Sequence, residues 1–325
     1  METRLMSRRG FATWLAALAG TAVQAQPMAT ARPLRLVVPY APGAAADQLA
    51  RTLERPLTQA LAQPIVVDNR AGAGGTLGAD MVAKAAPDGL TLVLGNDATH
   101  ATNLHLARSF PYDPVRHFTP VALVAFNPIV LVVHPSLPVR TVDELLRHVR
   151  AHPRELSFGS SGIGTPYHLA GALLNERAGL DLVHVPYKGG APALTDLLGG
   201  NIQVLFASLA TVLPHMQRGH VRALATTGSK RLDALPQLPT MAETLPGYAL
   251  GGWLALFAPA ELPTPQQARL NAAVNQVLGR EDIRTALLQA GQMPAGGTPQ
   301  ALAELVAAEL VQRSRLVKAA GIDAE

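Results

Sequence analysis

The chain has no cysteine among its 325 residues. A thiol is needed for a disulfide, for a thiolate metal site and for the lipid attachment of a bacterial lipoprotein, so the sequence excludes all three. Aromatic residues make up only 4% and charged residues only 15% of the chain, and the formal net charge is +4. So small and dispersed a charge argues against a nucleic-acid partner and is only mildly favourable for an anionic ligand.

The first 25 residues have the three regions of an export signal. Arginines give a positive start, residues 11–23 form an uncharged apolar stretch, and small residues up to Ala25 fit a cleavage site. The stretch is shorter than the roughly 20 residues that a membrane-spanning helix needs. We therefore expect a signal peptide at residues 1–25, cleaved after Ala25, and a free periplasmic protein. The pair Arg8-Arg9 leaves both Sec and twin-arginine export open.

Strand-like apolar runs alternate with alanine- and leucine-rich helical patterns along the rest of the chain, which is typical of parallel α/β proteins. The expected strands are residues 34–38, 65–68, 91–94, 129–133, 156–159, 182–185, 204–207, 223–226 and 253–258. The expected helices are residues 47–61, 79–85, 142–152, 166–178, 191–198, 266–278, 281–290 and 299–319.

This order of elements predicts two α/β lobes, joined by two crossing strands, with a ligand cleft between them. We expect lobe 1 to comprise residues 26–130 and 255–325, and lobe 2 to comprise residues 131–254. The crossings are expected near residues 130–134 and 254–258, with the C-terminal helices returning to lobe 1. In such sheets, ligands bind at the carboxyl ends of the strands.

Two loop-to-helix junctions of similar chemistry stand out, at residues 38–47 and 159–168. Each follows a strand-like run and is rich in small residues, which let the backbone approach a ligand closely. The unpaired N–H groups and partial positive charge at a helix start suit a carboxylate. Two such junctions facing one cleft would bind a small organic anion without any catalytic group.

The second junction shows which donors to expect. Thr165 can cap the helix that begins at Pro166, where the missing N–H costs nothing. The donors left for a ligand are then the N–H groups of Tyr167 and His168 and those of residues 160–164.

Charged residues near the junctions have two interpretations each. Asp47 either caps or braces its own loop or touches the anion, and the first is expected because like charge repels an anion. Lys188, within the helix-starting turn at residues 187–193, either adds a positive charge at the cleft edge or is a solvated lysine.

Glycine-rich segments give no catalytic motif. Residues 69–78 lack both the third glycine of the dinucleotide fingerprint and the Lys-Ser/Thr of a P-loop, so we interpret them as a structural turn. Residues 159–163 lack the second glycine of a nucleophile elbow. A serine esterase using Ser160 or Ser161 is therefore an unfavoured alternative, since no spacing selects a histidine and a carboxylate to activate either serine.

One helix carries Glu144, His148 and His152 at a spacing that could bind zinc. Arginines interleave with them, and the histidines lie toward the C-terminal end, where positive charge is favourable. We interpret this face as solvated, and we expect neither a metal nor a cofactor.

Six segments together resemble the Bug-type solute receptors of tripartite tricarboxylate transporters. They are residues 38–51 (VPYAPGAAADQLAR), 66–79 (VVDNRAGAGGTLGA), 86–95 (APDGLTLVLG), 160–171 (SSGIGTPYHLAG), 184–200 (HVPYKGGAPALTDLLGG) and 238–247 (LPTMAETLPG). They follow the family's order and span nearly all of the mature chain. The resemblance implies a monomeric periplasmic binding protein of type II-like, two-lobe architecture and no enzymatic activity. It also implies that residues 40–47 and 160–168 hold a small carboxylate through backbone N–H groups, hydroxyls and bridging water.

The implied partners are a membrane permease or, for some members, a sensor kinase. The expected function is therefore capture of a small organic carboxylate for a tripartite transporter, with a ligand-sensing subunit as the alternative.

The chain departs from the family pattern at two places. The first loop of the family usually has two glycines and a Ser or Thr before the Asp, and here those positions hold Gly43-Ala44 and Ala46. Many members carry Asp and Asn where this chain has Ala207-Ser208, and such an Asp could pair with a ligand amino group. Its absence favours a plain mono- or dicarboxylate over an amino acid, with an apolar or aromatic body against Tyr40, Tyr167 or Trp253.

The candidate ligand-binding residues share a place at strand ends or helix starts around the expected cleft. They are Tyr40, Gly43, Ala44, Ala45, Asp47, Asn96, Asp97, Thr99, Ser160, Ser161, Gly164, Thr165, His168, Tyr187, Lys188, Ala207, Ser208 and Trp253.

Overall fold

The computed structural model describes residues 32–187 and 189–322. The predicted signal peptide at residues 1–25, its cleavage position after Ala25 and the candidate Lys188 lie outside the described residues. Within the described part of the chain, no helix is both long enough and apolar enough to cross a membrane.

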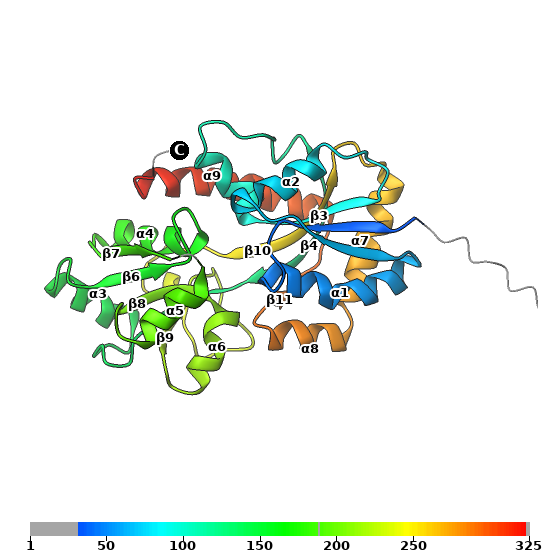
Figure 1. The fold of residues 1–325 in the computed structure, drawn as a ribbon. Coiled ribbons are helices and arrows are strands. Elements are labelled where there is room, and N and C mark those ends of the chain that lie inside the picture. The colour runs from blue at the N-terminus through cyan, green and yellow to red at the C-terminus, as the bar shows by residue number, and fades with distance from the viewer. Residues whose placement is uncertain (1–31, 188, 323–325) are drawn as a thin grey trace, which may run out of the picture. The chain divides into compact units, whose positions relative to one another are not determined.

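Two separate β-sheets form the framework (Figure 1). The first has the strand order β11-β4-β10-β3-β1-β2, and the second has the order β7-β6-β8-β5-β9. The strands are β1 Leu34–Val38, β2 Ile65–Asn69, β3 Thr91–Asn96, β4 Phe118–Asn127, β5 Ile129–Val133, β6 Ser157–Ser160, β7 Val183–Pro186, β8 Val204–Ser208, β9 Arg222–Thr226, β10 Gly252–Pro259 and β11 Met293–Pro294. We call the bodies around the first and second sheets lobe 1 and lobe 2, and the predicted two-lobe α/β architecture is confirmed.

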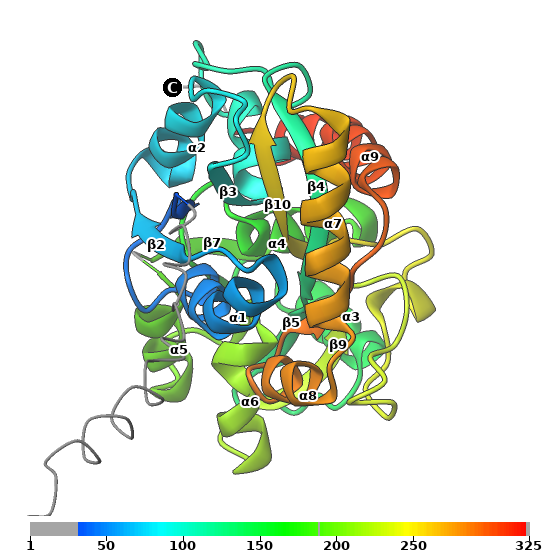
Figure 2. The same ribbon diagram turned by 90° about the vertical axis from the view of Figure 1, so that its right-hand side faces the viewer.

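Helices cover both faces of each sheet (Figure 2). They are α1 Ala45–Leu61, α2 Thr76–Ala83, α3 Val142–Ala151, α4 Pro166–Ala178, α5 Gly190–Leu198, α6 Leu209–Gln217, α7 Thr264–Leu278, α8 Glu281–Gln289 and α9 Pro299–Ala319. In lobe 1, α1, α7 and α8 pack on one face, while α2 and the first half of α9 pack on the other. In lobe 2, α3 and α4 cover one face, and α5 and α6 cover the other.

Apolar spacing explains how these helices are placed. In α1, Leu49, Leu53 and Leu57 recur at helical intervals and are all buried in the lobe 1 core. In β5, all five residues are buried, as the continuous apolar run predicted. Parallel pairing, which the alternating pattern indicated, is present in both sheets, but β5 pairs antiparallel with both β8 and β9, and β10 pairs antiparallel with β3 and β4.

The chain passes from lobe 1 to lobe 2 at Pro128, between β4 and β5, and returns at Gly251, just before β10. The two passages lie side by side, because Gly252 pairs with Asn127. They precede the positions expected near residues 130–134 and 254–258; residues 130–133 lie within β5 and residues 254–258 lie within β10.

Three of the strands and helices named above escaped the sequence patterns, β4, α6 and the two-residue β11, and each contains a proline. The ten-residue strand β4 includes Pro120, which lies next to a register irregularity in the pairing with β10. Helix α6 includes Pro214. Proline removes a backbone donor and normally argues against the interior of a strand or helix.

The last long helix, α9, belongs to both lobes. Leu302 and Val306 pack in the lobe 1 core, whereas Leu316 and Val317 pack in the lobe 2 core. Helices α7 and α8 pack on the lobe 1 core, whereas α9 packs on the cores of both lobes.

Candidate functional site

A cavity of about 290 Å³ lies between the two lobes beside the passages; we call it the interlobe pocket. Lobe 1 and the passages supply Tyr40, Gly74, Asn96, Asp97, Ala98, Asn103, Leu106, Asn127 and Gly252 to its lining. Lobe 2 supplies Ile129, Ser161, Ile163, Gly164, Thr165, Pro166 and Tyr167. The sequence candidates that meet here are Tyr40, Asn96, Asp97, Ser161, Gly164 and Thr165.

The lobe 2 wall is the start of α4. Thr165 caps the helix, since its hydroxyl accepts a hydrogen bond from the N–H of His168 at 3.4 Å, and Pro166 follows at the first helical position, as predicted. The loop also uses two of its own donors, because Gly162 N–H binds the Ser160 hydroxyl at 3.2 Å and Gly164 N–H binds His168 Nδ1 at 3.1 Å.

Three donors remain on this wall. Ser161, Ile163 and Tyr167 all line the interlobe pocket, and among the described residues their N–H groups have no hydrogen-bond acceptor. The set differs from the expected one because His168 N–H and Gly164 N–H are used within the loop. Unpaired N–H groups at a helix start form an anion site when they open onto a cavity.

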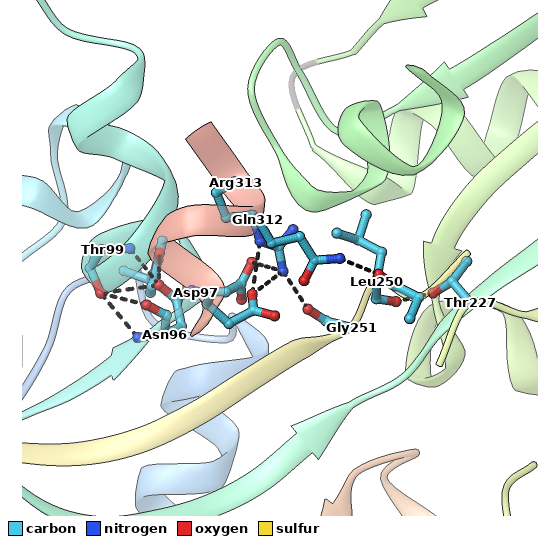
Figure 3. Close-up of polar contacts among 11 residues, drawn as sticks. Asn96, Asp97, Thr99, Thr227, Leu250, Gly251, Gln312 and Arg313 are labelled. Atoms are coloured by element: carbon cyan, nitrogen blue, oxygen red, sulfur yellow. Dashed lines mark hydrogen bonds and ion pairs between the residues drawn. The ribbon is translucent and has the colours of Figure 1, made fainter. Parts of the chain in front are cut away.

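The lobe 1 wall is held by a compact polar network. The Tyr40 hydroxyl donates to Asn96 Oδ1 at 3.0 Å, and Asn96 and Thr99 exchange hydrogen bonds at 3.0 Å (Figure 3). Burial raises the pKa of Tyr40, and the negative charge of Asp97 adds to this, so the phenol keeps its proton. Thr99 itself is buried outside the pocket and positions Asn96.

Asp97 carries the only charge among the described residues that line the pocket. It is 3% exposed, and burial raises its pKa to about 6 despite the nearby Arg313 guanidinium. Arg313, on α9, is fully buried behind it and donates to the carbonyl of Gly251 at 2.7 Å (Figure 3). Arg313 therefore connects Asp97, on the pocket wall, to the returning passage at Gly251.

The first junction lies outside the pocket except for Tyr40. Gly43 is exposed, and Ala44 and Ala45 are half-buried away from the lining. Asp47 braces its loop, as expected: its carboxylate accepts from Gly43 N–H at 2.8 Å and from Asn69 at 3.0 Å. Burial acts to raise the pKa of Asp47, but these hydrogen bonds and that from Arg51 bring it below its ordinary value.

Three further candidates lie behind the second junction. His168 stacks on His184 at 3.8 Å, and His184 Nε2 shares a 2.7 Å hydrogen bond with the hydroxyl of Ser160. Burial lowers the pKa of both histidines to about 4, so both are neutral at pH 7. The Tyr187 hydroxyl donates to Asp196 at 2.7 Å. These side chains support the loop and do not line the pocket.

The chain matches one family along most of its length. The model of the family described as tripartite tricarboxylate transporter family receptor matches residues 49–322. The chain belongs to this receptor family.

Individual relatives agree with this membership. The UPF0065 protein in the tcbD-tcbE intergenic region of Pseudomonas sp. (strain P51) is 41% identical over 88% of this chain and 85% of its own length. Protein BugT of Bordetella pertussis is 37% identical over 90% of each chain. Among solved structures, R. palustris Rpa4515 with adipate has a TM-score of 0.81 and 38% identity, covering 90% of this chain and 99% of its own. MatC from Rhodopseudomonas palustris, with bound malate, has a TM-score of 0.75 and 36% identity, covering 88% and 99%.

Membership of the receptor family settles how the Ser160–His184 pair is understood. The family and its structural neighbours are solute-binding receptors. Ser160 is fully buried, and among the described residues no carboxylate binds His184, so the serine has neither access nor an oriented base. In this receptor the pair shapes the loop.

The candidates Ala207, Ser208 and Trp253 lie next to the pocket rather than in its lining. Ser208 caps α6 by accepting from Thr211 N–H at 3.3 Å, and Trp253 is 2% exposed in the lobe 1 core. Tyr167, which lines the pocket, connects it to Ser208. Its hydroxyl lies against Ser208 and Asn127, and burial raises the pKa of Tyr167 to about 12.

Several lining residues were missed in the sequence. Asn127 ends the unpredicted strand β4, and Asn103 and Leu106 follow a short helix after β3 that has no periodic pattern. Gly74 was assigned to a structural turn, and it does lie in one, with its carbonyl accepting from Asn103 at 3.0 Å. Recognising β4 would have placed Asn127 at a strand end and so in the cleft.

Proposed function

We propose that this chain is a periplasmic receptor that captures a small organic carboxylate in the interlobe pocket and delivers it to the membrane permease of a tripartite transporter. One observation carries the proposal: among the described residues the N–H groups of Ser161, Ile163 and Tyr167 are unpaired at the start of a 13-residue helix, and they border the interlobe pocket. Such a set binds a carboxylate without a basic side chain.

The relatives support the ligand class. Two similar structures hold adipate and malate, both of which are small carboxylates. Another is described as the periplasmic binding protein BugD, with a TM-score of 0.76 and 33% identity. The same location for this chain agrees with the export signal proposed at residues 1–25, with cleavage after Ala25.

We assign different roles to the candidate residues. Tyr40, Asn96, Ser161, Gly164 and Thr165 contact the ligand or bridging water from the pocket wall. Five other candidates hold these in place: Thr99 orients Asn96, Asp47 fixes the first loop, and Ser160, His168 and Tyr187 support the second.

The lobes are proposed to close on the ligand as two bodies in a monomer, close to the expected residues 26–130 with 255–325 and residues 131–254 but divided at Pro128 and Gly251. The adjacent passages at Pro128 and Gly251 support this, because a hinge requires few residues to change their backbone angles.

Native mass spectrometry of the mature protein purified from periplasm tests the proposal. A stoichiometric small molecule, identified after denaturation as an organic acid, is the expected result. An empty protein that no carboxylate stabilises in a thermal-shift screen would refute it.

The partner needs a separate test, because a sensing subunit would bind the same ligand. A strain without this receptor should lose uptake of the released acid. Unchanged uptake combined with lost induction of the genes that degrade the acid would favour the sensor alternative.

A further inference from the structure

Asp97, the charged residue of the pocket lining, belongs to a cluster that holds more acidic groups than basic groups. Two carboxylates, Asp97 and Glu309, face a single guanidinium, Arg313 (Figure 3). Glu309 binds Arg313 at 2.6 Å, whereas Asp97 lies 3.9 Å from it. The cation is therefore matched mainly to Glu309, and the negative charge of Asp97 is left largely uncompensated.

Asp97 is also short of hydrogen bonds. One carboxylate oxygen, Oδ2, is buried without a hydrogen-bond donor among the described residues, and Arg313 Nη1 is likewise unpaired. The carboxylate accepts from the backbone N–H of Trp253, at the start of β10. The acid is thus fixed in place but not neutralised by its surroundings.

The rest of the pocket offers no charge to balance it. The other described lining residues are neutral, and the donors that suit an anion lie on the α4 side, at Ser161, Ile163 and Tyr167. The two lobes therefore line the pocket with different chemistry: lobe 2 presents N–H donors and lobe 1 presents a carboxylate.

We infer that Asp97 makes the pocket selective for monocarboxylates with a neutral far end over dicarboxylates of the same length. The inference rests on the proposed function, because it assumes that the first carboxylate binds at α4. A second carboxylate on the ligand would then be repelled by the carboxylate of Asp97. In the partly buried, low-polarity pocket this repulsion changes the binding affinity by about tenfold or more.

Matched ligand pairs test this directly. Adipate and adipamic acid have the same shape but differ by one charge, and so do succinate and succinamic acid. In titration calorimetry at pH 8, we expect each monoamide to bind the wild-type protein at least about tenfold more tightly than its diacid. Asp97→Asn should remove the difference, while the Arg313–Glu309 pair remains to keep the buried cluster neutral.

The matched control is Asp181→Asn, which removes an equal charge from an exposed carboxylate on lobe 2, with 59% of its side chain exposed. It should keep the wild-type preference.

A second measurement needs no variant. The groups that face Asp97 are Arg313 and Glu309 on α9, Tyr40 after β1 and Tyr167 on α4, and burial raises the pKa of both tyrosines. With a pKa of about 6, Asp97 is ionised at pH 8 and half protonated at pH 6. The preference for the monoamides should therefore shrink as the pH falls to 6.

Other outcomes separate the two proposals. Equal or tighter binding of the diacids by the wild-type protein at pH 8 overturns the inference and leaves the carboxylate receptor intact. A dicarboxylate released from the purified protein does the same. No binding of any carboxylate overturns both.

Discussion

Gly164 shows at the scale of one residue how the lobes meet beside the pocket. Its φ is +75°, a conformation that L-residues rarely adopt. A Cβ atom added here would lie 2.3 Å from Leu106 Cδ1, so the two groups would collide. Leu106 follows β3 in the chain yet packs on the core of lobe 2. A glycine is therefore needed for both the loop and the contact.

Gly164→Ala should weaken carboxylate binding at least about tenfold, because backbone strain of about 1–2 kcal/mol adds to the collision. Gly179→Ala is the control: it has a similar φ of +60° at the other end of α4, with nothing within 4 Å of the added atom. It should lose stability but keep its affinity in titration calorimetry. Equal affinities for Gly164→Ala and the wild type would contradict the placement of this loop against the ligand.

Thr165 has a second residue-scale role as the cap of α4. Thr165→Ala should lower the free energy of unfolding by about 1 kcal/mol and also weaken ligand binding, because the cap fixes the donors at the helix start. Thr141→Ala removes an equivalent cap from α3, on lobe 2. Denaturant unfolding should show similar losses for both variants, with only Thr165→Ala losing affinity; a matching loss in Thr141→Ala would mean that the effect is global.

At the scale of elements, α9 is fastened to the returning passage. Gln312 donates to the carbonyl of Ala249 and Arg313 donates to that of Gly251, while Thr227 donates to that of Leu250 (Figure 3). Three consecutive residues of the passage are thus held by side chains from α9 and from the end of β9. The passage is positioned by two elements rather than by its own sequence.

Arg313→Met should destabilise the protein by about 3–5 kcal/mol, since it leaves the buried carboxylates of Glu309 and Asp97 without their cation. Adding Glu309→Gln should recover part of the loss. Arg280→Met is the comparison, because it breaks a solvent-screened, exposed pair with Asp282 and should change the free energy of unfolding far less. Urea unfolding measures the free energy of unfolding of each variant. If Arg313→Met alone were as stable as the wild type, the cluster would not be buried as described.

Elements were predictable from the sequence where local pattern and tertiary packing agree. Helix α4 begins and ends as predicted, because Thr165, Pro166 and Gly179 mark its limits chemically. Strand β4 and helix α6 were not, because Pro120 and Pro214 contradict the surrounding pattern and are tolerated only through tertiary contacts.

The pocket was predictable only in part. The α4 donors follow from local capping rules, but Asn127 and Gly252 meet through pairing between β4 and β10, more than a hundred residues apart in the chain. The uncompensated charge of Asp97 depends on a helix far away in the sequence, which no local pattern reveals.

At the scale of the whole molecule, the buried acid affects stability against pH. Burial raises the pKa of Asp97 from 3.8 to about 6, so the unfolded chain releases this proton at lower pH than the folded protein does. The contribution to the free energy of unfolding therefore falls as pH rises from about 4 to about 6, by about 3 kcal/mol. Asp97→Asn should remove this slope, measured as the wild-type-minus-variant difference in urea unfolding at several pH values. Parallel curves would contradict the burial of a free carboxyl.

The sharing of α9 between the lobes has a consequence for biogenesis. The ribosome adds Leu302 and Val306, which complete the packing of lobe 1, and Leu316 and Val317, which complete that of lobe 2, only after every strand of both sheets has been made. Neither lobe can therefore complete its core packing before α9 has been synthesised. A nascent chain that stalls before α9, or a protein cleaved ahead of it, has two incompletely packed lobes rather than one intact lobe. Quality-control proteases would then act on both lobes together as one unfolded substrate.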